Sequence, residues 1–134
     1  MHHVDGAVAR PKRWPWQRDT LAFGWLDREH AFRQGACPPQ VVAHLEQAAR
    51  NPVDRTRGYH ACLFCPPREV PADQPWAMMG PTPYETGTGD VLQLGSASIE
   101  VEAGGQRWVA PNLVLHYITE HDYLPPDEVV HALT

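Results

Sequence analysis

The sequence predicts an α+β fold, a small single domain that combines a β-hairpin with two or three short helices. Residues 39–50 carry apolar side chains every three or four positions, which is a helical period. Around residues 91–110 apolar and polar side chains alternate, and two adjacent glycines follow the first run, which is typical of a hairpin. The chain has 134 residues, enough for one domain with a modest core.

The early helix is predicted from its two ends as well as from its period. Pro39 suits the first turn of a helix, and Val41 and Leu45 lie on one apolar face. Pro52 ends the pattern, because the residue before a proline avoids helical geometry. Glu46 is expected on the opposite, polar face.

The hairpin and the later helices follow in order along the chain. Gly104-Gly105 supplies the turn, because both residues tolerate positive φ, and residues 106–110 return as the second strand. A helix is then expected from Pro111 to about His121, and a last one over residues 126–133.

Two stretches lack a regular period. Residues 1–20 are broken by proline and are expected to form an extended N-terminal arm, which leaves residues 21–134 as the single domain. Residues 66–90 are expected to form one long loop, rich in proline, glycine and threonine. Three apolar side chains interrupt this loop and favour packing on the core: Trp76, Met78 and Met79.

Four residues have the chemistry of a zinc site. Cys62 and Cys65 are separated by two residues, so a tight knuckle can turn both sulfurs onto one ion. His116 and His121 are separated by four residues, within the range of the histidine half of Cys2His2 sites. We therefore expect an α+β domain that one Zn²⁺ ion clips together, with Cys62, Cys65, His116 and His121 as metal ligands.

The histidine part of this set is open to one alternative. His60 lies two residues before Cys62 and is an alternative ligand. Residues five apart on a helix point about 140° apart. His116 and His121 can therefore share an ion only if the last turn loosens or if His121 lies beyond it.

Other uses of the cysteines are less well supported. A redox pair prefers the start of a helix in a βαβ unit, and no such pattern surrounds Cys62. A disulfide would fit a secreted protein, but the N-terminal residues lack the features of a signal peptide. Two buried thiols remain the simplest alternative. Cys37, the odd cysteine, is expected to be a lone structural thiol.

The net charge of −5 is unevenly distributed. Residues 1–57 hold nine Lys or Arg and six Asp or Glu, a net +3, whereas residues 58–134 hold two and ten, a net −8. The halves can attract one another, or the acidic half can face a basic partner. Nucleic acid is disfavoured as a partner, because only the tryptophan-bearing residues 10–18 approach a basic stripe. No apolar run is long enough to span a membrane, so we expect a cytoplasmic protein.

Three blocks of the sequence together resemble a family of small uncharacterised bacterial proteins. The resemblance covers about residues 21–133 and implies no activity, but it supports the ligand set. The blocks are residues 58–65 with the pattern Gly-x-His-x-Cys-x-x-Cys, residues 94–101 with the pattern Leu-Gly-Ser-x-x-Ile-x-Val, and residues 110–126 with the pattern Ala-Pro-x-Leu-x-x-His-Tyr-x-x-x-His-x-Tyr-x-Pro-Pro.

Two classes of function remain. The first is a protein-interaction module with a structural zinc site, whose acidic C-terminal half faces a protein partner, as in an immunity or antitoxin-like protein. The second is a zinc-dependent hydrolase with an open metal position near His60. The first is favoured, because four protein ligands leave no position for water, and because the motifs of zinc proteases and deaminases are absent.

Overall fold

The computed structural model describes residues 2–66, 72–74 and 80–134. Its elements, in chain order, are β1 (Val8–Arg10), β2 (Thr20–Ala22), α1 (Pro39–Ala49), β3 (Thr82–Glu85), β4 (Val91–Leu94), β5 (Ser98–Ala103), β6 (Gln106–Pro111), α2 (Val114–His121) and α3 (Asp127–Leu133). The fold is therefore α+β, as predicted.

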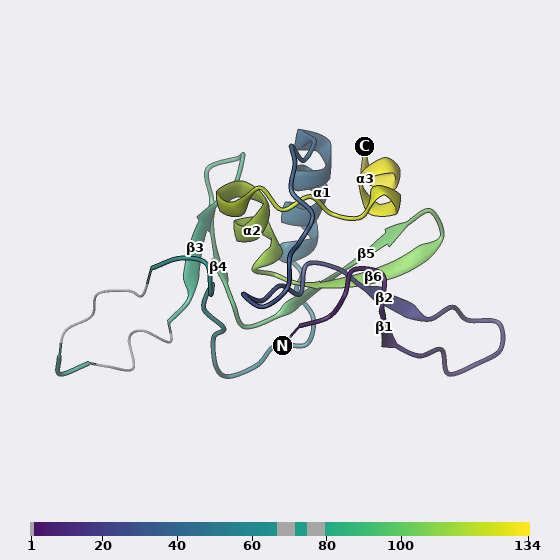
Figure 1. Ribbon diagram of the computed structural model, residues 1–134, viewed down its shortest axis with the longest axis horizontal. Coiled ribbons are helices and arrows are strands. Elements are labelled where there is room, and N and C mark those ends of the chain that lie inside the picture. Colours follow the sequence, from purple (N-terminus) through teal and green to yellow (C-terminus); the bar gives the residue numbers. More distant parts are fainter. Residues whose placement is uncertain (1, 67–71, 75–79) are drawn as a thin grey trace.

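A four-stranded sheet of order β1-β2-β6-β5 forms the base of the fold. The β1–β2 and β5–β6 pairs are antiparallel, whereas β2 and β6 are parallel, so the beginning of the chain pairs with a strand near its end. The three helices gather on one face of this sheet, and α1 and α3 both contact β5 (Figure 1). The separate two-stranded sheet consists of β3 and β4.

The predicted early helix is confirmed, but the prediction for one residue was wrong. Helix α1 begins at Pro39 and buries Val41 and Leu45. Glu46 is not on a solvated face, because it is only 8% exposed. It accepts a hydrogen bond of 2.7 Å from the hydroxyl group of Tyr84 in β3. A buried carboxylate needs such a partner, so this contact joins α1 to the small sheet.

The predicted hairpin is confirmed at β5 and β6, with φ values of 62° and 77° at Gly104 and Gly105. Residues 91–94 do not belong to it, because they form β4 and pair with β3. The expectation of an unbroken loop over residues 66–90 missed β3. That strand has only four residues and contains a proline, so its alternation is a weak signal. Trp76, Met78 and Met79 lie outside the described residues.

Asp5 joins the N-terminal segment to the rest of the protein. Its carboxylate accepts hydrogen bonds from the backbone N–H of Gly24, at 3.0 Å, and from the hydroxyl group of Tyr123, at 2.8 Å. The segment up to residue 20 also contains β1 and the first residue of β2, and therefore contributes to the sheet. The division into an arm and a domain stays a prediction.

The predicted helices near the end of the chain are confirmed as α2 and α3, and α3 buries Val129 and Leu133. The core lies between the helices and the sheet. Its largest fully buried side chains include Phe23, Leu45, Ile99 and Tyr123. The longest described helix has 11 residues, and none of the described helices is long and apolar enough to cross a membrane.

Candidate metal centre

The two cysteines lie in a short loop with a knuckle geometry. The backbone N–H of Phe64 donates a hydrogen bond of 3.4 Å to Sγ of Cys62, which closes the turn between the cysteines. The thiolate is the form of cysteine that binds metals. The Nε of Arg28 donates to the backbone carbonyl of Leu63 and holds the tip of the loop.

The two histidines come from α2, and the end of this helix is loosened. The backbone N–H of Asp122 bonds to the carbonyl of Tyr117, five residues back instead of four. Asp122 itself has a left-handed conformation with φ 56°. The structure therefore meets the condition that the spacing of His116 and His121 requires.

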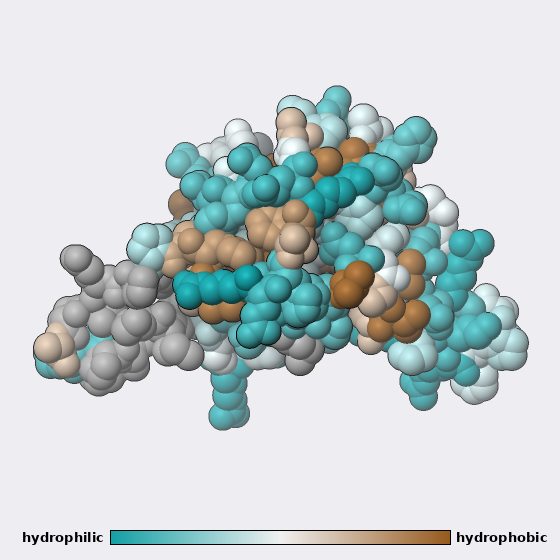
Figure 2. All heavy atoms as spheres, viewed as in Figure 1, coloured by the Kyte–Doolittle hydropathy of each residue, from teal (hydrophilic) through white to brown (hydrophobic). Residues whose placement is uncertain are grey.

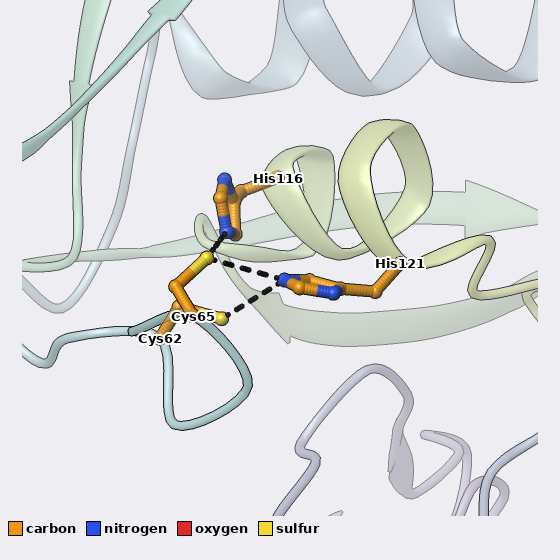
Figure 3. A group of neighbouring side chains, drawn as sticks. All are labelled: Cys62, Cys65, His116 and His121. Carbon is orange, nitrogen blue, oxygen red and sulfur yellow. Dashed lines mark hydrogen bonds between the residues drawn. The ribbon is translucent and has the colours of Figure 1, made fainter. Parts of the chain in front are cut away.

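The four side chains converge on one point between the loop and α2 (Figure 3). Sγ of Cys65 lies 3.3 Å from Nε2 of His116 and 3.4 Å from Nε2 of His121, and Sγ of Cys62 lies 3.2 Å from Nε2 of His121. The four ligand atoms lie within 4.8 Å of one another. In a tetrahedral zinc site, sulfur and nitrogen lie about 3.5 Å apart. The arrangement is close to that geometry.

The donor set fits Zn²⁺ in charge as well as in geometry. Two thiolates balance the two positive charges of the ion, and two neutral imidazoles complete the tetrahedron. All four residues are half-buried, and a neutral site is cheaper to bury than a charged one. This group can therefore hold a metal ion.

Gly95 connects the knuckle loop to the start of α2. Its carbonyl accepts a hydrogen bond of 2.7 Å from the backbone N–H of His60, and its own N–H donates to Oδ1 of Asn112, at 2.8 Å. Gly95 has φ +118°, and an added Cβ would lie 2.8 Å from the carbonyl oxygen of His60. Only glycine fits this position without strain.

His60 does not belong to the four-residue group. Its side chain is exposed, and the structure uses its backbone to hold the loop beside Gly95. It lines a cavity of about 620 Å³ on the side of the loop next to Trp25, Tyr59 and Tyr117. The alternative ligand of the sequence analysis is therefore placed next to a cavity instead of in the cluster.

The family described as Domain of unknown function (DUF7919) matches residues 1–134, which is the whole chain. The chain belongs to this family. No curated protein and no solved structure matches it. The family brings no assigned activity, so arguments about function depend on the site itself.

Aromatic rings cover the candidate metal centre on one side. The ring of Phe64 packs against His121, at 5.4 Å between centroids, Tyr117, at 5.9 Å, and Phe32, at 5.2 Å. Burial in this environment, together with the negative charges of Cys62 and Cys65, raises the pKa of the Tyr117 hydroxyl group to about 12. The rings limit the access of water to the sulfur atoms.

The other interpretations of the cysteines find little support in the geometry. Among the described residues no disulfide joins Cys37, Cys62 or Cys65, and neither member of the Cys62–Cys65 pair lies at the start of a helix. Burial raises the pKa of the Cys37 thiol to about 11. Cys37 is therefore protonated at neutral pH and suits a structural role.

Sequence reasoning missed the supports of the site. It did not assign a role to Asn112, which is 4% exposed and immediately precedes the residues that open α2. It also did not assign a role to Gly95 or to the N–H group of Phe64. The Leu-Gly-Ser block around Gly95 was the available signal, because a glycine next to a buried leucine often marks a close backbone approach.

Proposed function

We propose that this protein is a small zinc-binding module whose Cys2His2 site is structural, and that it acts in the cytoplasm by binding a protein partner. The proposal of a zinc site is supported by the convergence of four side chains: Cys62, Cys65, His116 and His121. Two segments about 50 residues apart each supply two ligands. A metal ion bound there links the knuckle loop to α2, and four protein ligands leave no open position for a substrate.

The stabilisation from the metal follows from mass action. A ligand that binds only the folded state, at a free concentration about 1,000 times its dissociation constant, stabilises it by about 4 kcal/mol. We expect zinc binding to contribute an amount of this order, mainly to the C-terminal half of the chain.

The test is zinc content and thermal stability of Cys62→Ser and Cys65→Ser, with Cys37→Ser as the matched control. We expect one zinc ion per chain in the wild type and in Cys37→Ser, and loss of zinc with a much lower melting temperature in the other two variants. A metal-free wild type that melts at the same temperature as the zinc-loaded protein would contradict a structural role.

The surface that we propose for the partner is acidic. Three carboxylates near the ends of α2 and α3 are exposed, and in residues 2–66, 72–74 and 80–134 no ion pair involves them: Glu120, Asp122 and Glu128. Hydrophilic residues cover most of the face in Figure 2, with hydrophobic residues in small patches. Charge, more than apolar area, is the available means of attracting a basic protein surface.

This proposal includes an immunity-like role, in which the acidic surface covers a basic toxin surface. The test compares co-purification of wild type with a variant that carries Glu120→Gln, Asp122→Asn and Glu128→Gln. Glu85→Gln is the control, because Glu85 is an exposed carboxylate of β3 and belongs to neither α2 nor α3. A partner held by wild type and control, lost from the triple variant and released by salt would support the proposal. Equal retention by all three would contradict it.

A zinc-dependent hydrolase with an open position near His60 is the second candidate, and the cavity beside His60 is the observation that favours it. Zinc-edge absorption spectroscopy separates the two candidates. Two sulfurs and two nitrogens support the structural site. An oxygen in the coordination sphere supports the hydrolase and would justify a screen of substrates.

A further inference from the structure

A second group of metal-binding side chains lies in a different part of the structure. His2, Asp27 and His30 each offer one ligand atom, and these atoms lie within 4.8 Å of one another. None of the three belongs to the Cys2His2 group. We propose that these residues bind a second divalent metal ion of the class of Ni²⁺, Cu²⁺ or Zn²⁺.

The distances show a site that is nearly assembled. Nδ1 of His30 lies 2.7 Å from Oδ1 of Asp27, and Nδ1 of His2 lies 3.8 Å from the same oxygen. Nitrogen and oxygen ligands of a tetrahedral zinc ion lie about 3.4 Å apart. The two observed distances bracket this value, so a shift of about half an ångström is enough to bind an ion.

The strongest argument comes from the side chain of His2. Its Nδ1 atom is buried and has no hydrogen-bond partner in the described structure. Such an atom costs free energy unless water or an ion satisfies it. At 3.8 Å the carboxylate of Asp27 is too far for a hydrogen bond but suitably placed to share a cation.

The two imidazole rings also stack on each other, and each places its Nδ1 atom beside the same carboxylate oxygen. The rings of His2 and His30 stack with their centroids 4.0 Å apart and 5° between their planes. The stacked arrangement brings both rings beside one carboxylate, and a neutral imidazole is the form of histidine that binds metals. Two imidazoles and one carboxylate suit divalent ions of the late first transition row.

The backbone holds the carboxylate in place. Oδ1 of Asp27 accepts hydrogen bonds from the N–H groups of Glu29, at 3.2 Å, and His30, at 3.1 Å. Its other oxygen, Oδ2, has no hydrogen bond among the described residues and is available to a cation. The hydrogen bond with the imidazole ring of His30 is the largest cause that keeps the pKa of Asp27 below its usual value. The carboxylate is therefore ionised at neutral pH.

The surroundings supply negative charge and space. A cavity of about 620 Å³ borders His2 and His30, and its lining includes the acidic residues Asp5, Glu29 and Glu128 and the ion pair of Arg33 with Asp127. Acidic walls raise the local concentration of cations. The cavity leaves room for water molecules to complete the coordination sphere, so the site has open positions.

The ion would fasten the beginning of the chain to the segment that supports the cysteine knuckle. The N-terminal end supplies His2, and the segment that holds Asp27 and His30 also holds Arg28, which binds the knuckle loop. Phe32 from the same segment packs on Phe64. The second ion therefore extends the chain of contacts that begins at the Cys2His2 group.

The experiment is a calorimetric titration of Ni²⁺ into the zinc-loaded protein without an affinity tag, with release of zinc monitored by a chromogenic chelator. The variants are Asp27→Asn and His30→Gln. His131→Gln is the control, because His131 is an exposed histidine of α3 and belongs to neither group. Zinc content and melting temperature show that each variant remains folded.

We expect the wild type and His131→Gln to bind one Ni²⁺ per chain without losing zinc. Asp27→Asn and His30→Gln should each bind at least about tenfold more weakly, in line with the loss of a metal-site group. No binding by the wild type, or equal binding by all four proteins, would overturn the proposal. Neither result depends on whether the Cys2His2 site is structural.

Discussion

Single residues with unusual environments hold the candidate metal centre in place. The carbonyl of Gly95 accepts a hydrogen bond from the backbone N–H of His60, and the N–H of Gly95 donates one to the side chain of Asn112. These two bonds set the distance between the knuckle loop and α2. Gly95 can do this only because it lacks a side chain. The positions of Cys62 and Cys65 therefore depend on a residue that binds no metal.

We predict that Gly95→Ala destabilises the protein by about 1–3 kcal/mol more than Gly89→Ala. Both glycines have positive φ, 118° and 90°, but an added Cβ meets the carbonyl of His60 only at Gly95. The control therefore carries the cost of positive φ without the clash. Urea denaturation of the two zinc-loaded variants measures the difference, and equal stabilities would show that the close approach is unimportant.

Glu46 is a second residue whose environment was unexpected. We predict that Tyr84→Phe lowers the free energy of unfolding by about 1–3 kcal/mol, because Glu46 loses a donor inside the protein. Tyr59→Phe is the control, since that hydroxyl group has no hydrogen bond to any residue in the described part of the chain. Chemical denaturation compares the two variants, and a neutral effect of Tyr84→Phe would contradict the account of this pair.

At the scale of elements, α2 combines two roles. It packs Leu115 and Ile118 into the core, and its loosened end presents His121 beside His116. The helix is short, with 8 residues. A helix of this length is marginal by itself and takes its stability from packing and, as we propose, from the metal.

We predict that removing the metal exposes α2 and the knuckle first. After addition of a chelator, backbone amides of residues 60–65 and 116–123 should lose protection from hydrogen exchange before those of β5 and β6, because ladder hydrogen bonds hold the hairpin independently of the metal. Hydrogen exchange followed by mass spectrometry measures the order. Simultaneous loss of protection everywhere would show that the metal supports the whole fold equally.

The elements differ in how far the sequence could predict them. The helices and the β5–β6 hairpin have strong local periods, and the spacing of Cys62 and Cys65 indicates a metal site without any structure. The pairing of β2 with β6 could not be predicted, because strands of three residues carry almost no periodic signal. Strand β3 has only four residues and carries an equally weak periodic signal. Glu46 was misplaced because its helical position suggested solvent, whereas its partner lies 38 residues away.

At the scale of the whole molecule, the uneven charge of the sequence is partly used inside the fold. Among the residues that the structure describes, three ion pairs join the basic first part of the chain to the acidic second part: Arg10 with Glu100, Arg33 with Asp127, and Arg50 with Asp90. The attraction between the halves that the charge pattern allowed is therefore present. Which pairs form could not be predicted, because surface side chains leave no spacing pattern across distant segments.

We predict a loss of stability above pH 10 that involves three tyrosines. Burial is the largest cause that raises the pKa of three tyrosines in the folded protein: Tyr84, Tyr117 and Tyr123. In the unfolded chain a tyrosine ionises near pH 10. Because the folded-state pKa is the higher one, ionisation of these tyrosines stabilises the unfolded state as the pH rises above about 10. The stability is complete below that pH and falls above it.

Denaturation at pH 9 and at about pH 11 measures this loss, and absorbance near 295 nm reports the ionisation of tyrosine. Tyr84→Phe should lose less stability between the two pH values than the wild type, because it lacks one of the three groups. An unchanged stability of the wild type over this interval would contradict the burial of these hydroxyl groups.

The parallel pairing of β2 with β6 has a consequence for the time at which the protein folds. Leu21 pairs with Trp108, so the centre of the sheet depends on residues that are synthesised 87 positions apart. Contacts of such long range slow folding, because a large loop must close before they form. During synthesis β2 waits with an unpaired edge until β6 emerges. The chain is most prone to aggregation during this interval, and a chaperone that covers an edge strand would act then.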